Sequence, residues 1–235
     1  MALNAREVSG GGSDIPPMEP GTYPGRLTHV IGLGLQPQTF DGEEKAPQQE
    51  IQVVYELSDE FLKDEDGEDD PKKPRWLYET FALHNLAADR AKSTQRYFAL
   101  DPTEEHGGDW AKLIGLPCMI TVINKVGTKG KNKGKVFNNV ASISAMRSKE
   151  AAKLPALVHP TKFFDPSEPD IEVFMSLNDK LKDKIVKGLE YGGSDLERLV
   201  RDYKPKEKDA EPKVKKPKAE VVEEGDDEAK DGVNW

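Results

Sequence analysis

The sequence has 235 residues but a single cysteine, Cys118, and no long apolar run. One cysteine excludes an intramolecular disulfide and every zinc site built from several cysteines, and it favours a reducing compartment. No segment approaches the length of about 18 apolar residues that a membrane span needs. Residues 1–20 also lack the apolar core of a signal peptide. We therefore expect a soluble, cytoplasmic protein that does not contact a membrane.

Candidate catalytic residues are scarce. Gly32 and Gly34 resemble the start of a dinucleotide loop, but Pro37 stands where the third glycine belongs, which favours a turn at a strand end. The acidic run 64–70 has Asp69 where a calcium-binding EF-hand loop needs glycine, so we expect a solvated loop. The histidines lie far apart in sequence, which favours packed or solvated side chains over a metal site. They are His29, His84, His106 and His159. We predict no enzymatic activity, no metal and no cofactor.

Apolar residues are also few, and the charge is unevenly placed. Charged residues make up 33% of the chain, against about 25% in an average soluble domain, and the net charge is −9. Residues 201–218 hold eight bases and four acids, whereas residues 219–235 hold seven acids and one lysine. Such a polar, proline-interrupted segment cannot bury enough surface to offset its ordering entropy. We expect a disordered tail over 203–235, basic and then acidic, and a flexible N-terminal arm over 1–20.

Between these ends the periodicity favours strands. Five strands are expected, at 22–33, 49–57, 75–83, 118–125 and 136–144. In the second, Tyr55 shares a face with Ile51 and Val53, which predicts that it is buried. Helix formers at 87–100 and 109–114 separate the third strand from the fourth. The predicted order is therefore three strands, a helical segment and a hairpin.

That order is the connectivity of the OB-fold, a Greek-key barrel that binds oligonucleotides and oligosaccharides, although other small α+β folds share it. We predict a mostly β (α+β) protein with a five-stranded OB-fold barrel over 21–147 and a helix between strands 3 and 4. Residues 148–202 are expected to form a helical extension packed on the barrel. Ser176 is expected to cap its first helix, and Ser194 with Glu197 to form a capping box for its second.

A lysine-rich loop joins the last two strands. It contains no acid, and its glycines let it bend, so its ammonium groups can follow a phosphate backbone. We call residues 125–135 the lysine finger; its lysines are Lys125, Lys129, Lys131, Lys133 and Lys135. A merely solubilising hairpin tip is the alternative.

Aromatic residues in the strands supply flat surfaces on which bases stack. Trp76 and Tyr78 are the main candidates because basic residues precede them in the sequence. The predicted DNA-binding residues outside the lysine finger are Arg26, Lys72, Lys73, Arg75, Trp76, Tyr78 and Phe137.

The acidic tail ends in Trp235, and large aromatics are frequent as interface anchors. Its carboxylates can compete with phosphates for a basic groove or bind basic partner proteins. The predicted partner-binding residues are Glu223, Glu224, Asp226, Asp227, Glu228, Asp231 and Trp235.

With these features the sequence resembles the OB-fold single-stranded DNA-binding proteins of bacteriophages. The resemblance rests on GTYPGRLTHVIGLG at 21–34, EIQVVYEL at 50–57, DWAKLIGLPCMITVIN at 109–124, KVFNNVASISA at 135–145 and the acidic tail. It implies a non-catalytic protein that coats single strands during phage DNA replication or recombination and recruits replication proteins through its tail. The best-known members end in phenylalanine, where this chain has tryptophan.

The sequence supports three hypotheses in descending order. The first is sequence-tolerant binding of single-stranded DNA, with the tail competing for the binding groove. The second is an acidic adaptor or DNA mimic that binds basic partners, and the third is a nuclease. Oligomeric state stays open, and a homo-oligomer is among the alternatives.

Overall fold

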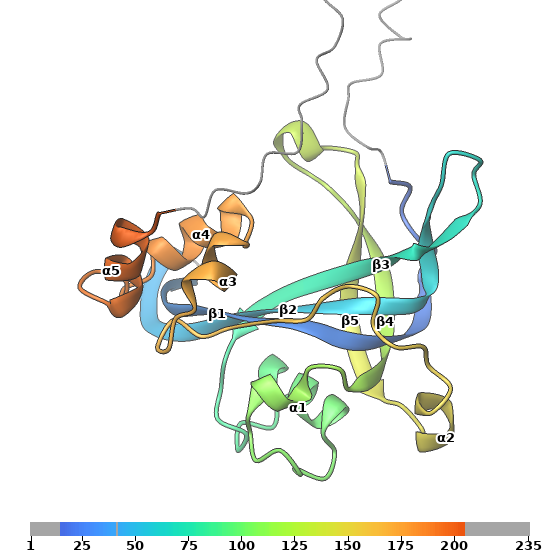
Figure 1. Cartoon of the computed structure of the whole chain (residues 1–235), viewed down its shortest axis with the longest axis horizontal. Helices are drawn as coiled ribbons and strands as arrows, with labels where there is room; N and C mark the ends of the chain where they lie inside the picture. The colour runs from blue at the N-terminus through green and yellow to red at the C-terminus, as the bar shows by residue number, and fades with distance from the viewer. Residues whose placement is uncertain (1–14, 41, 205–235) are drawn as a thin grey trace, which may run out of the picture. The chain divides into compact units, whose positions relative to one another are not determined.

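The computed structural model describes residues 15–40 and 42–204, which form a mostly β α+β fold around an antiparallel sheet (Figure 1). Its long strands are β1 (Gly21–Phe40), β2 (Glu43–Lys63), β3 (Asp69–Ala82), β4 (Pro117–Val126) and β5 (Val136–Ala145). They are ordered β3-β2-β1-β4-β5, and a short strand β6 (Lys162–Phe164) pairs in parallel with β1. All five predicted strands are confirmed; β6 was not predicted.

The structure contains the predicted helical segments between β3 and β4 and the two predicted helices of the C-terminal extension, together with three short segments that were not predicted. The helix α1 (Lys92–Leu100) and the 3-10 turn η1 (Trp110–Leu113) lie between β3 and β4. A second such turn, η2 (Gly130–Asn132), lies in the lysine finger. The C-terminal helices are α2 (Ser148–Ala151), α3 (Ile171–Met175), α4 (Asp179–Val186) and α5 (Asp195–Asp202). No helix in the described residues is long and apolar enough to cross a membrane.

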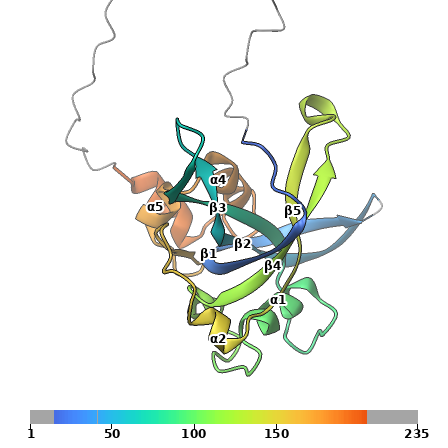
Figure 2. The ribbon, with the colours of Figure 1, turned by 90° about the vertical axis from the view of Figure 1, so that its right-hand side faces the viewer.

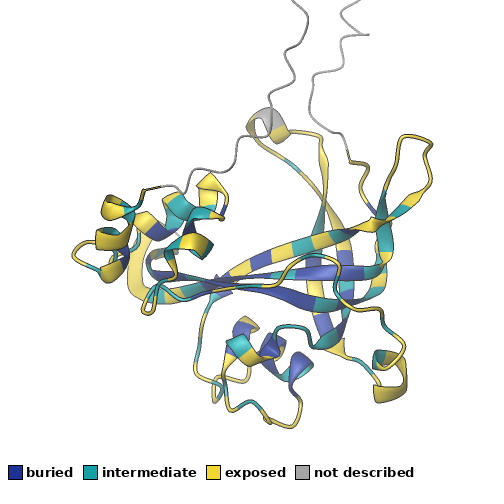
Figure 3. Cartoon of the chain, viewed as in Figure 1, coloured by how far each residue is buried: buried dark blue, intermediate teal, exposed yellow. Residues whose placement is uncertain are grey.

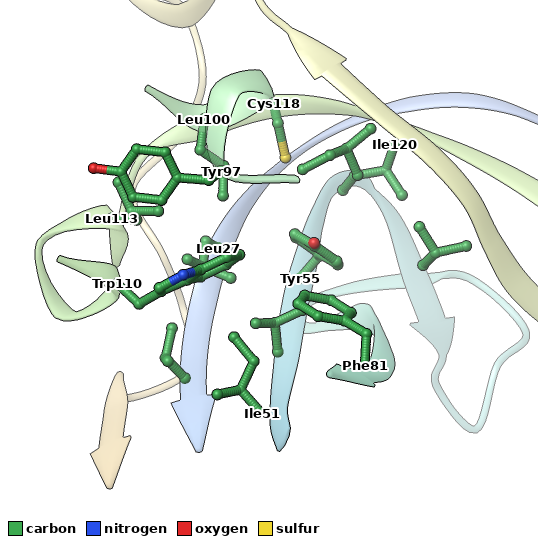
Figure 4. Close-up of a cluster of buried hydrophobic side chains, with 14 of the residues drawn as sticks. Leu27, Ile51, Tyr55, Phe81, Tyr97, Leu100, Trp110, Leu113, Cys118 and Ile120 are labelled. Carbon is green, nitrogen blue, oxygen red and sulfur yellow. The ribbon is translucent and has the colours of Figure 1, made fainter. Parts of the chain in front are cut away.

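The main hydrophobic core lies on one face of the sheet, beneath α1 and η1. Alternation along the strands turns Leu27, Tyr55 and Ile120 inward, and each is fully buried. These side chains meet Tyr97 from α1 and Trp110 from η1 (Figure 4). Figure 3 shows the alternation along β3, where exposed and buried residues follow one another. The burial of Tyr55 is as predicted.

The predicted closure of the barrel is corrected by the structure: among the described residues, β3 and β5 form no hydrogen-bonded ladder. Arg96 of α1 spans the gap instead. Its guanidinium donates to both carboxylate oxygens of Glu79 on β3, at 2.7 and 3.1 Å, and to the carbonyl of Ala141 on β5, at 3.1 Å. Arg96 and Glu79 are both buried, and the buried Tyr55 hydroxyl also donates to Glu79. A side-chain network therefore stands where the ladder of a closed barrel would be.

A second core joins the C-terminal helices to β1 and β6. Ile31 and Leu33 of β1 pack there against Phe164, Phe174 and Ile185. In Figure 1 the helices α3, α4 and α5 gather near the turn between β1 and β2. This packing holds α4 beside the outer face of the sheet.

The caps of the C-terminal helices match one prediction and overturn another. The Ser194 hydroxyl accepts from the Glu197 amide, so the predicted cap of α5 is confirmed. The predicted Ser176 cap is wrong, because the Asn178 side chain caps α4 and Ser176 ends α3. The short helix α3, which was not predicted, comes directly before this point. The N-cap of α4 is therefore Asn178, two residues later than the predicted Ser176.

Part of the predicted N-terminal arm lies within the described residues. Met18 is buried in the main core, and its backbone exchanges hydrogen bonds with Asn124 of β4 and Asn138 of β5. The Arg75 side chain donates to the carbonyl of Pro16. Residues 1–14 and 205–235, which include the predicted tail sites, lie outside the described residues.

Candidate nucleic-acid interface

The outer face of the sheet carries the two aromatic side chains that the sequence analysis favoured. Trp76 and Tyr78 alternate along β3 with the inward residues Leu77 and Glu79. They are 52% and 69% exposed, which is unusual for side chains so large. The Tyr78 ring has no aromatic partner in the described part of the chain. It therefore offers an open surface for stacking, whereas Trp76 does not.

One side of Trp76 is occupied by His159. The two rings stack with centroids 4.6 Å apart and planes 17° apart, the geometry a nucleobase would adopt. The His29 ring lies 5.8 Å from Trp76 at a tilt. These two histidines are 130 positions apart in the sequence, where they were expected to be packed or solvated side chains. The structure brings both to one tryptophan.

His159 belongs to an extended segment, residues 154–162, which we call the strap. It crosses the outer face, and it is held by polar groups that sequence reasoning did not assign. Glu56 of β2 accepts from the amides of Val158 and His159 at 2.8 Å each, and from the His159 ring at 2.6 Å. No residue of the strap is buried, so polar contacts rather than core packing fix its position.

Arg26, a predicted DNA contact, has protein partners in the structure. Its guanidinium donates to the carbonyls of Gly115, Leu154 and Pro155 at 2.9, 3.3 and 3.0 Å. It therefore anchors the strap from β1. The sequence indicated only that Arg26 is a basic residue near strand aromatics, and its partners in the strap lie more than 120 residues later in the chain.

Below the strap, His29 is nearly buried and titrates unusually. Burial, reinforced by the nearby charge of Lys162, lowers the pKa of His29 to about 4. The other groups near its ring are the carbonyl of Pro160, His159 and Glu56. The neutral ring is therefore the form that the folded protein holds at neutral pH.

This lowered pKa predicts acid sensitivity. The unfolded chain protonates His29 near pH 6.5, but the folded chain does so only near pH 4. Stability from this group is therefore present above pH 6.5 and decreases as the pH falls toward 4. We expect a loss of about 2 kcal/mol between pH 7 and pH 5, measured by urea unfolding. The variant His29→Gln should lose that part of the pH dependence, and an unchanged profile would contradict the assignment.

A groove of about 830 Å³ opens between this outer face and the C-terminal helices. Tyr78, Trp76 and Val54 lie on its sheet side, and Leu181 lies on its helix side. Three lysines also line it: Lys162 of β6 and Lys180 and Lys184 of α4. None of these three was predicted. The only signal in the sequence was the position of Lys180 and Lys184 beside apolar residues of a predicted helix, and Lys162 had none because β6 was not predicted.

A second cavity, of about 650 Å³, has the opposite electrostatic character. Its lining includes the carboxylates of Asp109, Asp165, Glu190 and Asp195. Such a lining repels phosphate groups, so this cavity does not extend the nucleic-acid surface. Among the described residues no group of His, Cys, Asp or Glu is arranged to hold a metal ion.

The lysine finger is the tip of the β4–β5 hairpin, which projects beyond the sheet on the same side as the β2–β3 hairpin (Figure 2). Lys129, Lys133 and Lys135 are exposed and form no ion pair in the described part of the chain. Phe137 is 42% exposed and lies opposite Lys125 in the β4–β5 register. The backbone of Lys131 lies in η2. The finger therefore presents unpaired positive charge with an aromatic ring at its base.

The remaining predicted residues lie on the β2–β3 hairpin among acids. Lys73 pairs with Asp70 at 2.9 Å, and this hydrogen bond lowers the pKa of the Asp70 carboxyl. Lys72 is exposed next to it, and its amide donates to Asp70. Asp70 therefore lies beside Lys72 and Lys73, and these lysines and Arg75 belong to a different hairpin from the lysine finger.

The predicted DNA-binding residues therefore fall into four places rather than one. Trp76 and Tyr78 share the outer face, the lysine finger and Phe137 form one projecting surface, and Arg26 lies under the strap. Lys72, Lys73 and Arg75 lie on the β2–β3 hairpin. Comparison of the chain with protein-family models and with curated proteins finds no match, so its geometry is the basis for assigning a function.

Proposed function

We propose that this protein binds single-stranded DNA without strong sequence preference and without catalysis. The carrying observation is the open ring of Tyr78, which is 69% exposed on the outer face of β3 beside Trp76. OB-folds use the face of strands 2 and 3 for oligonucleotides, and the strand order β3-β2-β1-β4-β5 is compatible with an OB-type barrel left open between β3 and β5. Base stacking on such rings contributes about 1–3 kcal/mol per base and tolerates any sequence.

The lysine finger supports the same proposal. Unpaired lysines on a projecting loop can neutralise phosphates and release counterions, which makes binding strong at low salt and weak at high salt. The resemblance to phage single-stranded DNA-binding proteins adds a setting, namely phage DNA replication or recombination. In this setting the protein coats exposed strands and acts without a cofactor.

Tyr78 gives the sharpest test of this function. We expect Tyr78→Ala to weaken binding of labelled oligo-dT about 10-fold, because one stacked base loses its surface. Fluorescence anisotropy at two salt concentrations measures the change. The control Tyr78→Phe keeps the ring and should bind like the original protein. Absence of oligo-dT binding at low salt, or equal binding to duplex DNA, would refute the proposed function.

The acidic tail, residues 219–235, completes the proposal although it lies outside the described residues. Its carboxylates compete with DNA for the lysines, and together with Trp235 it recruits replication or recombination proteins. We expect deletion of 219–235 to tighten oligo-dT binding, most at low salt where the competition is strongest. A full-length control with the tail acids changed to Asn and Gln should tighten binding as well. Unchanged affinity in both would contradict the competition.

The alternative hypothesis, an acidic adaptor or DNA mimic, predicts different results in binding experiments. A DNA mimic or acidic adaptor binds no oligonucleotide, and it keeps basic partner proteins after nuclease treatment. Within the described residues, the acids at the β2–β3 tip are partly neutralised by Lys63 and Lys73. That pairing leaves a weaker acidic surface than the sequence alone indicates.

A further inference from the structure

The groove beside Tyr78 has walls of contrasting chemistry. Its sheet wall carries the aromatic rings, and its helix wall carries lysine side chains from α4. The helix is held firmly in place: Ile185 is buried in the second core, and the Gln36 side chain donates to the carbonyl of Lys184. The groove is therefore part of the folded structure and needs no closing movement to form.

The charged side chains that line the groove differ in whether they already have a partner. Lys184 pairs with Glu50 of β2, and the Lys162 ammonium donates to the carbonyl of Ser176 at 3.2 Å. Asp179, the acid of this lining, pairs with Lys182 at 3.2 Å. Lys180 is exposed and forms no ion pair within residues 15–40 and 42–204. One cation beside Tyr78 is therefore free to take a new anionic partner.

We propose that the helical extension forms half of a nucleotide subsite, in which a base stacks on Tyr78 and the adjoining phosphate binds Lys180 and Lys162. This inference rests on the proposed function and adds a role for α4 that the lysine finger does not supply. The combination of an aromatic platform and a cationic wall is the one that single strands require. A duplex does not satisfy it, because its base faces are stacked on one another and cannot reach Tyr78.

The strap covers the ring next to Tyr78 and leaves Tyr78 itself open, as this subsite requires. His159 already covers Trp76, so a base entering the outer face finds Tyr78 as the open ring. The strap ends at Lys162, which then lines the groove. The strap and α4 thus limit the site to the stretch of β3 that contains Tyr78.

Two lysines of the same helix test the subsite. Lys180 lines the groove, whereas Lys187 at the end of α4 is exposed and does not. We expect Lys180→Ala to reduce the salt slope of oligo-dT binding by about 0.7 and to weaken binding about 4-fold at 0.15 M salt. Lys187→Ala should change neither quantity. Lys180 lies in the first turn of α4, where loss of a positive charge does not destabilise the helix.

A double variant separates this inference from the proposed function. Tyr78→Ala combined with Lys180→Ala should lose less affinity than the two single effects predict together, because both groups hold one nucleotide. If the unmodified protein does not bind oligo-dT, the proposed function fails. If it binds and Tyr78→Ala weakens binding, but Lys180→Ala behaves like Lys187→Ala, the function stands and the subsite is refuted.

Discussion

Replacing Glu79 with alanine should lower the free energy of unfolding by about 3–5 kcal/mol, a large part of the stability of a single domain. The substitution removes the acceptor for Arg96, Lys92 and the hydroxyl of Tyr55. Arg96 is only 3% exposed, so its charge would stay buried without a partner. Urea unfolding followed by tryptophan fluorescence measures the loss.

Two further variants keep this prediction testable even if Glu79→Ala fails to fold. Glu79→Gln retains an acceptor for Tyr55 but not the charge, so an intermediate loss is expected. Lys92→Ala removes the partner that is 43% exposed and should cost about 0–1 kcal/mol. If Glu79→Ala and Glu79→Gln lost no more than Lys92→Ala, the network would not be what joins β3 to β5.

Removing three charges from the lysine finger should weaken oligo-dT binding about 50-fold at 0.15 M salt. The triple variant is Lys129→Ala, Lys133→Ala and Lys135→Ala. Each phosphate contact on a single strand contributes about 0.7 to the salt slope, so the slope should fall by about 2. Anisotropy titrations over a series of salt concentrations measure both quantities.

The matched control removes the same number of charges elsewhere. Lys149, Lys153 and Lys187 are exposed and form no ion pair in the described part of the chain. Their triple alanine variant should keep the original slope, apart from a small change through net charge. Equal losses in the two triple variants would show that the finger acts through overall charge and not through phosphate contact.

The alternation of residues was enough to predict the strands and their two faces. It predicted that Tyr55 is buried, and this is confirmed. The exposure of Trp76 and Tyr78 was indicated instead by the basic residues that precede them in the sequence. Such local patterns work because a strand turns successive side chains to opposite faces. The segment before α3, which is rich in proline and aromatic residues, has no comparable period. For that reason β6 and the strap were not predicted.

Long-range partners account for the other differences. In the sequence, Arg96 looks like an ordinary polar residue of a helix. It is buried only because β3 and β5 both approach it and supply its hydrogen-bond acceptors. Similarly, Glu56 alternates like any outward residue, although the strap arrives more than 100 positions later to bind it. Lys162, Lys180 and Lys184 likewise line a groove with segments that are distant in the sequence. Sequence periods describe the faces of elements, but they do not say which distant segment covers a face.

The strand β1 has a consequence for how the molecule folds. Its neighbouring residues Val30 and Ile31 belong to different hydrophobic cores, and its pairing with β2 shifts register at three places. A slip by one residue would move the apolar groups of both cores to the wrong side at once. Correct docking of the C-terminal helices therefore requires that β1 has already found its alignment. We expect the helices to join last, through contacts distant in sequence that slow the search.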